Sequence, residues 1–570
     1  MTSSSKPDYA ITVERNVPVV MRDGTRLMTD VHRPKASGRF PVILERTPYD
    51  KTQSSETRMG AAEFYAARGY VSVFQDVRGR WASEGEFYPF RDDGAGANRD
   101  GYDTVEWCAA QPWSNGKVGT IGGSYSGATQ YRMLAARPPH LVCQFVRQSS
   151  SDYHNEWVYR SGALELEFNL AWTLRNSANH AARLVPGDAA ARVRIEKAVQ
   201  QMESWTGHLP LNPMPPMEGF YRWFTDWLDH PDDGPYWHEF SIVQRHNEVD
   251  TPVYHLGSWF DGFLRGSLKN YSGMRSSAKT EIARASQRLL IGPWVHGPDS
   301  INKSLVGEVE FGPDAAHILN ELRLPWFDHW LKGMKNGVMD TPPVRLFTMG
   351  ANRWRYADDW PPPEASYTPF YLHAGRSGGT LSKALPEGAE QPDSYVYDPL
   401  NPVPSLGGGH LGTRSGPYDQ RAVEGRALTY TSEPLLKAVE VTGPVKAILF
   451  ALSSAKDTDW VVRVTDVHPD GASILVCDGI LRARYRNSRS QPGLLAGNVE
   501  RYEVDLWGTS YLFKEGHRIR VAVTSSGFPR WDRNMNTGGD NSREATGVVA
   551  VNTVFHDSIR PSHVILPVIP

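Results

Sequence analysis

Strand-like and helix-like segments alternate between residues 17 and 150, and this alternation restricts the possible folds more than any other feature of the chain. The strand-like runs, such as FPVILERTP and GYVSVFQDVRG, are rich in apolar and β-branched residues and are bounded by Gly and Pro. Between them, ETRMGAAEFYAARGY has the spacing of a helix that ends at a glycine. A chain with this alternation forms a mostly parallel sheet covered by helices on both faces.

The alternation is interrupted after residue 150 by a long segment with a different pattern. Strand signals are nearly absent from residues 151–245, where stretches such as EFNLAWTLRNSANHAARL have helical spacing. Strand-like runs return in TPVYHLGSWFD and QRLLIGPWVHG. We therefore expect a helical insertion that divides the sheet-forming sequence into two parts.

Short strands separated by turn residues fill the last part of the chain. VRLFTMG, EVTGPVKAILFALSS and HRIRVAVTSS alternate with Gly, Pro, Asn and Asp, which is typical of an antiparallel sandwich or jelly roll. The predicted fold class is therefore α/β with an added all-β domain. The predicted organisation is a first α/β part in residues 1–150, a helical cap insertion in 151–245, a second α/β part in 246–340 and a jelly-roll β-sandwich in 341–570.

The charge balance excludes several classes of partner. The chain has 61 Lys and Arg against 64 Asp and Glu, so its formal net charge of −3 generates no long-range field for nucleic acid or an anionic membrane. The three cysteines, Cys108, Cys143 and Cys477, are too widely spaced for a disulfide framework or a metal knuckle. We find no signal-peptide pattern and no apolar run of about 20 residues, and therefore expect a cytoplasmic protein.

The stretch GKVGTIGGSYSGATQYRMLAA carries the strongest local signal for chemistry. A strand ends at Ile121, the chain turns through small residues around Ser124, and a helix follows, which is how a nucleophilic hydroxyl is presented above a sheet. The usual pattern is G-x-S-x-G, whereas here the second glycine is Gly127 and Ser126 occupies its place. Ser126 itself lacks flanking glycines at the right spacing, so we reject it as nucleophile. A glycine-rich turn without catalysis is the alternative.

A serine nucleophile needs a base and an orienting acid, and in α/β-hydrolases the chain order is Ser, acid, His. Asp261 follows the strand TPVYHLGSWF and His296 follows the strand RLLIGPWV, in that order. Either residue alone is usually a cap or a surface residue, but together with Ser124 they predict a catalytic triad. The competing histidines do not follow a terminal strand in this order; they are His154, His255, His317 and His329.

Two groups are candidates for stabilising the oxyanion of a tetrahedral intermediate. One is the backbone N–H of Tyr125, directly after Ser124. The other is the phenolic O–H of Tyr49, which follows the strand FPVILE in the segment ERTPYDK. A turn tyrosine packed on the domain surface is the alternative for Tyr49, and the residues alone do not decide between the two.

No metal and no other cofactor is predicted. The acidic segment RDDGAGANRDGYD lacks the alternating ligand spacing and the final Glu of a calcium loop. The chain has no HExxH motif, no CxxC pair and no phosphate-binding Gly-Lys loop.

Motifs along nearly the whole chain resemble those of the cocaine esterase and X-Pro dipeptidyl-peptidase family of serine hydrolases, closest to its bacterial cocaine esterase branch. In chain order these motifs are LERTPYDK, QDVRGRWASEGEF, GKVGTIGGSYSG, WFDGF, GPWVHG, DTDWVVRVTDVHPDG and SSGFPRWDRNMNTG. The resemblance implies an α/β-hydrolase domain with a helical cap and a C-terminal jelly roll. The family elbow reads G-x-S-Y-x-G, which the shifted Gly127 fits. The implied site residues are Ser124 as nucleophile, Asp261 as acid, His296 as base, and Tyr49 with the Tyr125 amide as the oxyanion hole.

The family includes esterases, amidases, amino-acid ester hydrolases and aminopeptidases, and the last two must bind a substrate ammonium group. In amino-acid ester hydrolases acidic residues closely follow the catalytic Asp, whereas uncharged residues 262–264 follow Asp261 here. This argues against amine-bearing substrates, although three acidic residues of the insertion keep them open: Asp152, Glu165 and Glu167. Four aromatic residues map near the acyl pocket of the esterases and favour a bulky or aromatic acyl group: Trp157, Trp172, Trp259 and Phe263.

We therefore predict a serine esterase that cleaves carboxylic esters with a bulky or aromatic acyl group through an acyl-enzyme on Ser124. An amidase or acylase, or an amino-acid ester hydrolase or aminopeptidase, is the alternative within the family. A carbohydrate-binding protein with an inactive hydrolase domain is the alternative from another class. The expected partner is a small-molecule ester, with no nucleic acid and no membrane. The sequence allows a homodimer but does not fix the oligomeric state.

Overall fold

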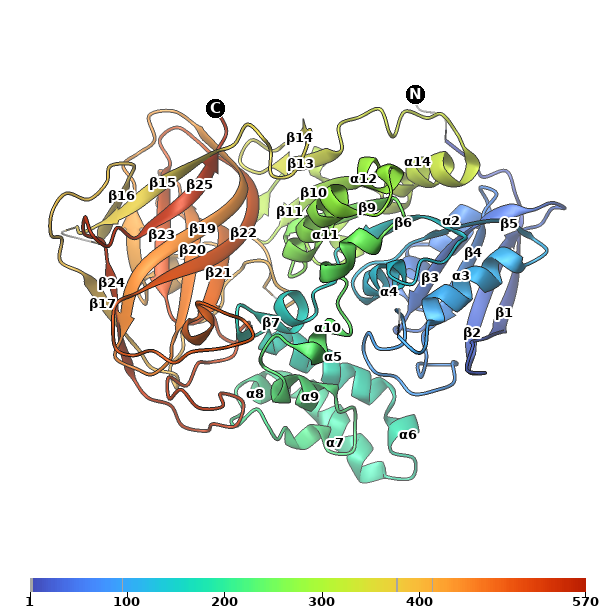
Figure 1. Ribbon diagram of the computed structural model, residues 1–570, viewed down its shortest axis with the longest axis horizontal. Helices are drawn as coiled ribbons and strands as arrows, with labels where there is room; N and C mark the ends of the chain where they lie inside the picture. Colours follow the sequence, from blue (N-terminus) through green and yellow to red (C-terminus); the bar gives the residue numbers. More distant parts are fainter. Residues whose placement is uncertain (1–3, 95, 376–377, 413) are drawn as a thin grey trace.

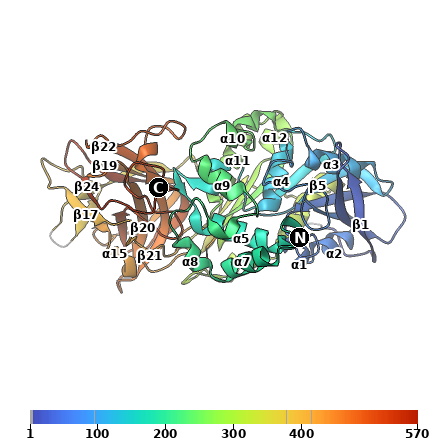
Figure 2. The same ribbon diagram turned by 90° about the horizontal axis from the view of Figure 1, so that it is seen from below.

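The computed structural model describes residues 4–94, 96–375, 378–412 and 414–570. The molecule is elongated, with a mixed α/β part at one end and a β-domain at the other (Figure 1). The helical insertion lies between these ends along the long axis, as the view from below in Figure 2 shows. Among the described residues, none of the helices combines the length and the apolar character needed to span a bilayer.

The α/β part is built on one ten-stranded sheet. The strands from β4 to β13 run parallel, while the outer strands pair antiparallel. This topology confirms the predicted α/β fold with a mostly parallel sheet. The strand order is β1 (Ile11–Val20), β2 (Arg26–Pro34), β4 (Val71–Asp76), β3 (Phe40–Thr47), β5 (Ser114–Thr120), β6 (Leu141–Arg147), β9 (Val253–Phe260), β10 (Arg288–Val295), β13 (Val344–Thr348) and β14 (Arg353–Ala357).

Helices cover both faces of this sheet. Successive side chains of a strand point to opposite faces, and here the side chains on each face are apolar and need covering. On β3, Val42 and Leu44 belong to one buried cluster, and Ile43 between them belongs to another. The helices that pack in the first cluster are α3 (Asp100–Ala110), α4 (Tyr125–Leu134) and α11 (Leu264–Ser277), and those in the second are α2 (Ala61–Ala66) and α14 (Leu319–Lys332).

One strand is placed differently from the sequence prediction. The prediction puts VRLFTMG in the C-terminal domain, whereas β13 pairs in parallel with β10 in the main sheet. The helix α14 carries the chain back along the sheet between these two strands, so they form one more βα unit of the α/β part. The main sheet therefore continues past the expected boundary at residue 340, to the end of β14.

The chain between β6 and β9 is mainly helical, with a short two-stranded ribbon formed by β7 (Tyr159–Arg160) and β8 (Ala163–Leu164). Its core is largely aromatic, and Trp223, Trp227 and Trp237 are among the largest fully buried side chains of the protein. The longer elements are the π-helix η1 (His154–Val158), α5 (Leu166–Asn179), α7 (Ala189–Gln200), α8 (Met202–Thr206) and α9 (Trp223–Asp229).

The C-terminal domain is an all-β structure of eleven strands. Its core is continuous with one face of the main sheet, since Trp460 and Val523 belong to the same buried cluster as Phe260 and Leu289. This shared core joins the two domains over a wide area. The strands are β15 (Ser366–His373), β16 (Gly379–Ser382), β17 (Asp393–Tyr397), β18 (Leu428–Thr431), β19 (Val439–Ser453), β20 (Asp459–Val467), β21 (Ser473–Arg482), β22 (Glu500–Phe513), β23 (Arg518–Thr524), β24 (Ala550–Phe555) and β25 (His563–Val568).

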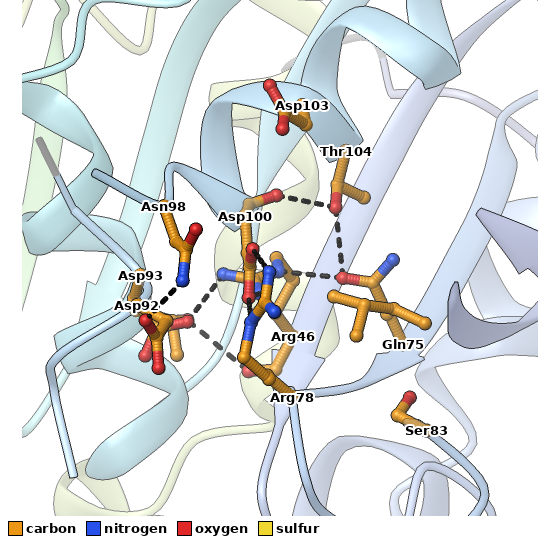
Figure 3. A network of polar contacts seen from close by, with 12 residues as sticks. Arg46, Gln75, Arg78, Ser83, Asp92, Asp93, Asn98, Asp100, Asp103 and Thr104 are labelled. Carbon is orange, nitrogen blue, oxygen red and sulfur yellow. Dashed lines mark hydrogen bonds and ion pairs between the residues drawn. The ribbon is translucent and has the colours of Figure 1, made fainter. Parts of the chain in front are cut away.

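A buried polar network explains the acidic segment RDDGAGANRDGYD (Figure 3). Arg46, at the end of β3, donates to Asp93 at 2.6 Å and to Gln75 at 2.8 Å. Arg78 donates to Asp100 at 2.7 Å. The carboxylates of Asp93 and Asp100 thus compensate arginines that are themselves buried, as an interior charge requires. The network holds this segment against the carboxyl ends of β3 and β4. In the sheet, β3 is the neighbour of β5, the strand that precedes Ser124.

Candidate active site

The candidate residues lie where four neighbouring parallel strands end. In the sheet the order is β5, β6, β9 and β10, and the residues that follow these strands include Ser124, Gln148, Asp261 and His296. Because the carboxyl ends of parallel strands meet at one edge, segments far apart in the sequence converge there, as in other open α/β sheets.

Ser124 occupies a strained elbow between β5 and α4. Its backbone has φ 57° and ψ −124°, outside the usual regions for a residue with a side chain. Its carbonyl accepts from the N–H groups of Gly127 at 3.0 Å and Ala128 at 2.9 Å, so Ser124 caps the ten-residue helix. A Cβ on Gly123 would lie 2.3 Å from the Arg147 guanidinium, so a larger residue beside the serine would displace this buried arginine. The elbow places the Ser124 hydroxyl at the positive end of the α4 dipole.

The two departures from the usual elbow pattern have a structural reason. A Cβ on Gly127 would lie 2.6 Å from the Cβ of Ser149, so α4 can pack on the end of β6 only because residue 127 is a glycine. The side chain of Ser126 is buried and hydrogen-bonds to Glu45. Burial raises the pKa of the Glu45 carboxyl to about 8. The rejected Ser126 therefore lies inside the domain.

Asp261 and His296 form a hydrogen-bonded pair. The Nδ1 atom of His296 lies 3.1 Å and 3.2 Å from the two carboxylate oxygens of Asp261. Asp261 is fully buried and also accepts from the backbone N–H of Phe263 at 2.8 Å, whereas the His296 side chain is 18% exposed. A carboxylate at Nδ1 holds the proton on that nitrogen and leaves Nε2 free as a base. The described contacts include no direct hydrogen bond between His296 and Ser124.

Gln148, which the sequence analysis did not identify, connects the backbone of Ser124 to the loop that carries His296. Its backbone carbonyl accepts from the N–H of Ser124 at 3.2 Å. Its side-chain amide donates to the carbonyl of Val295 at 2.7 Å and accepts from the N–H of Gly297 at 2.9 Å, on either side of His296. Gln148 has a positive φ of 46°, which aims its side chain at this loop. No sequence motif identifies Gln148, because its contacts depend on which strands lie beside β6 in the sheet.

Tyr49 lies beside the nucleophile. Its hydroxyl interacts with Ser124 and accepts a hydrogen bond from the indole N–H of Trp172 at 2.9 Å. Burial raises the pKa of the Tyr49 phenol to about 12, so the group stays protonated. Because Trp172 uses an acceptor site of the Tyr49 oxygen, the phenolic proton remains available to a developing anion. This arrangement favours the oxyanion role over the alternative of a turn tyrosine.

Tyr125 contributes to the site through its backbone and its ring. Its N–H is in the first turn of α4, where amide groups have no intrahelical acceptor. Its hydroxyl accepts from the N–H of Phe90 at 2.8 Å, and its ring stacks on Trp172 at 5.9 Å. These contacts fix the position of the elbow relative to the cap.

An aromatic cluster adjoins His296. The rings of Trp157 and Phe263 stack with their centroids 4.2 Å apart, and Phe263 meets the His296 ring edge-on at 5.4 Å between centroids. The ring of Phe168, on α5, lies 5.9 Å from the rings of Trp157 and Phe263. Leu411, from a loop of the C-terminal domain, packs against the same cluster. Sequence reasoning missed Phe168 and Leu411, because only tertiary packing brings them to the site.

Trp259 lies outside this cluster, contrary to the prediction that grouped it with the acyl pocket. Its indole N–H donates to the carbonyl of Phe347 at 2.7 Å, and its ring lies 5.9 Å from Trp360. It belongs to the core shared with the C-terminal domain. Although Trp259 is only two residues from Asp261 in sequence, it lies within β9 and its side chain faces the shared core instead of the site.

The acidic residues of the insertion differ in their surroundings. Asp152 lies 3.4 Å from both Lys269 and Arg489. Glu165 forms an ion pair with Arg160 at 3.0 Å. Both carboxylates are buried and each is paired with positive side chains, which leaves little charge to attract an ammonium group. Glu167 is partly exposed on α5, and its carboxylate lies 3.7 Å from His410.

The competing histidines have other environments. His255 is buried between the Tyr131 hydroxyl at 2.7 Å and Gln287 at 3.0 Å, and burial lowers its pKa to about 3. Burial also lowers the pKa of His317, to about 4. His154 bonds the carbonyl of Pro231 at 2.9 Å. His329 is on α14, and its ring packs on Trp330 at 5.1 Å.

Comparisons with known proteins show the family of the chain. A family model described as X-Pro dipeptidyl-peptidase (S15 family) matches residues 23–298. Another, described as the X-Pro dipeptidyl-peptidase C-terminal non-catalytic domain, matches residues 336–565. A cocaine esterase from Rhodococcus sp. (strain MB1 Bresler) is 38% identical over 595 residues, covering 99% of each chain. The chain belongs to this family of serine hydrolases.

Two solved structures share the fold over the full length. An aminopeptidase from the marine sediment archaeon Thaumarchaeota archaeon has a TM-score of 0.82 at 27% identity, covering 100% of this chain and 98% of its own. An α-amino acid ester hydrolase has a TM-score of 0.81 at 26% identity, with the same coverage. The predicted family, its fold and its serine-hydrolase class are thus confirmed.

Proposed function

We propose that this serine hydrolase cleaves carboxylic esters by two-step acyl transfer through Ser124. His296 accepts the Ser124 proton while the hydroxyl oxygen attacks the ester carbonyl, and Asp261 stabilises the imidazolium that forms. The Tyr49 hydroxyl and the Tyr125 N–H donate to the oxyanion. When the intermediate collapses, the alcohol leaves with the proton from His296. Water then repeats these steps on the acyl-enzyme and releases the acid.

One structural arrangement supports this proposal more strongly than any other. Tyr49, which is bonded by Trp172, interacts with Ser124, and the loop that carries His296, the partner of Asp261, is linked to the Ser124 backbone through Gln148. A base, an anion-stabilising donor and a serine hydroxyl at one edge of a sheet are what acyl transfer requires.

The aromatic cluster beside His296 supports a preference for bulky or aromatic acyl groups. Phe263 meets the His296 ring edge-on and is backed by the stacked ring of Trp157, and an acyl group attached to Ser124 would lie beside Phe263. Aromatic surfaces of this kind bind flat apolar groups well. Comparing kcat/KM for p-nitrophenyl acetate, butyrate, benzoate and phenylacetate tests this preference. Phe263→Ala should reduce the benzoate-to-acetate ratio; an unchanged ratio would contradict the assignment.

An amino-acid ester hydrolase or aminopeptidase is the second candidate, and an amidase or acylase uses the same machinery. The structural matches to an aminopeptidase and an α-amino acid ester hydrolase, and the partly exposed carboxylate of Glu167, favour an amine-bearing substrate. The ion pairs of Asp152 and Glu165 oppose it. The p-nitrophenyl esters of phenylacetate and phenylglycine differ by one amino group and separate these functions. Ester and anilide forms of one acyl group separate esterase from amidase.

The remaining expectations concern location and partners. A near-neutral net charge supports a small-molecule ester as partner, without nucleic acid or membrane, and three cysteines that are all free thiols support a cytoplasmic location. A homodimer is compatible with these properties. A carbohydrate-binding protein with an inactive hydrolase domain is disfavoured by the assembled site, and labelling with a fluorophosphonate tests this, because a pure binding protein would not react.

A further inference from the structure

A second cluster of functional side chains lies in the C-terminal domain, away from the triad. Asp466 is at the end of β20, His468 follows it in the turn to β21, and His517 directly precedes β23. Strands β20 and β23 pair antiparallel, with Val467 opposite Arg518. The pairing therefore brings the two histidines to the same end of the strand pair as Asp466.

The donor atoms of this cluster are spaced as the ligands of one ion would be. The Nδ1 atom of His517 lies 2.9 Å from a carboxylate oxygen of Asp466, and the Nε2 atom of His468 lies 3.4 Å from the same oxygen. One ligand atom from each of the three residues lies within 4.8 Å of the others. Metal–ligand bonds of about 2.1 Å in a tetrahedral site separate neighbouring ligands by about 3.4 Å. Only small side-chain movements are needed to match this spacing.

The carboxylate is held in place by a neighbour that is not a ligand. The Tyr511 hydroxyl donates to Asp466 at 2.9 Å, and the Asp466 side chain is only 2% exposed. Such outer hydrogen bonds orient the ligands of protein metal sites. The His468 side chain is 34% exposed, so the cluster opens to solvent on one side. Three protein ligands with an open fourth position are a common zinc arrangement.

Two arginines, Arg518 and Arg520, line the same cavity as His468, and each has an acidic partner of its own, Glu433 and Glu424 respectively. Arg518, the nearest arginine in the chain, donates to the carbonyl of Ser432 at 2.9 Å and lies 3.6 Å from Glu433. An ordinary ion pair between Asp466 and His517 accounts for two of the residues, but not for the second imidazole. The rings of His468 and His517 lie 4.6 Å apart, both beside the same carboxylate.

We propose that Asp466, His468 and His517 form a divalent-metal site that takes Zn²⁺ or a similar imidazole-binding ion. Two imidazoles and one carboxylate suit zinc, copper and nickel better than calcium or magnesium. The ion would tie the β20–β21 turn to the start of β23 and take no part in ester hydrolysis. It would be a stabilising or regulatory site on the C-terminal domain.

Isothermal titration of the chelator-treated full-length protein with ZnCl₂ tests this proposal. The wild type should bind one equivalent at this site. His468→Ala should weaken this binding by more than about 100-fold, and Tyr511→Phe by about 10-fold, as expected for a ligand and for a neighbour that orients one. His140→Ala is the matched control, because His140 lies 2.7 Å from Glu106 with no second histidine described beside it.

Thermal unfolding gives an independent measurement, since a ligand that binds only the folded state raises the unfolding temperature. ZnCl₂ should raise it for the wild type and for His140→Ala but not for His468→Ala. All three proteins should unfold at similar temperatures without metal, because His468 is in a partly exposed turn. No binding to the wild type, or unchanged binding to His468→Ala, would overturn the proposal.

Discussion

The side-chain amide of Gln148 bonds the backbone on both sides of His296, at the carbonyl of Val295 and the N–H of Gly297. The imidazole of His296, the proposed base, is therefore positioned from two directions, by Asp261 at its ring and by Gln148 at its backbone. Gln148 also accepts from the N–H of Ser124, a donor that it shares with the carbonyl of Arg147, so one residue contacts the backbone on both sides of the proposed nucleophile–base pair.

Gln148→Ala should lower kcat for ester hydrolysis by about 10- to 100-fold, with a smaller change in KM, because a small displacement of a reacting group is costly. Steady-state kinetics measures the two parameters. Gln144→Ala is the control: Gln144 is a buried glutamine on β6, the strand that Gln148 follows, and it donates to the carbonyl of Gln130 at 3.0 Å. Equal losses of kcat in both variants would show that Gln148 acts only through stability.

Tyr49→Phe should reduce kcat by about 100- to 1,000-fold, the range for removal of one oxyanion donor. Trp172→Phe keeps an aromatic ring but removes the N–H that bonds the Tyr49 oxygen. Its loss should be smaller than that of Tyr49→Phe, because the phenolic donor remains. The double variant should lose little more than Tyr49→Phe alone, since both changes act on one hydroxyl. Additive losses would show that Trp172 acts independently of Tyr49, through the acyl group.

Glu45 predicts a specific dependence of stability on pH. Burial, the larger cause, and the negative charge of the nearby Glu56, the second, raise the pKa of Glu45 in the folded protein to about 8. The value expected in the unfolded chain is about 4.3. A raised pKa stabilises the fold below the unfolded value, and this stabilisation is lost as pH rises toward 8. Glu45→Gln should therefore lose less stability than the wild type between pH 5 and about 8. Parallel unfolding curves for the two proteins would contradict the raised pKa.

The network in Figure 3 predicts a large cost for an uncompensated buried charge. Asp93→Ala removes a partner of Arg46, whose side chain is fully buried, and should lower the free energy of unfolding by about 3 to 5 kcal/mol. Lys446→Ala breaks the exposed pair with Glu503 and should cost less than about 1 kcal/mol. Denaturant unfolding measures both; similar costs would show that burial does not govern this network.

Several parts of the site could be predicted from sequence because they depend on local signals. The elbow around Ser124 is a strand, a turn of small residues and a helix in one continuous stretch. Asp261 and His296 each follow a recognisable strand, and parallel strands bring such ends together whatever lies between them. The order of the segments was therefore sufficient to group these residues.

Other parts depend on packing that no local pattern records. Gln148 is important because β6 lies between β5 and β9 in the sheet, and its positive φ cannot be read from the sequence. Trp259 and Trp172 are both tryptophans near candidate residues, yet one packs in the shared core and the other bonds Tyr49. Strand β13 resembles the strands of the following domain in composition, and only its pairing with β10 reveals where it belongs.

The central claim is that Ser124 forms the covalent intermediate. Mass spectrometry after reaction with a fluorophosphonate locates the modified residue directly. The wild type and Ser126→Ala should each gain one label on the peptide that contains residue 124, and Ser124→Ala should gain none and lose ester hydrolysis while remaining folded. A label on any other residue, or retained esterase activity in Ser124→Ala, would contradict the account.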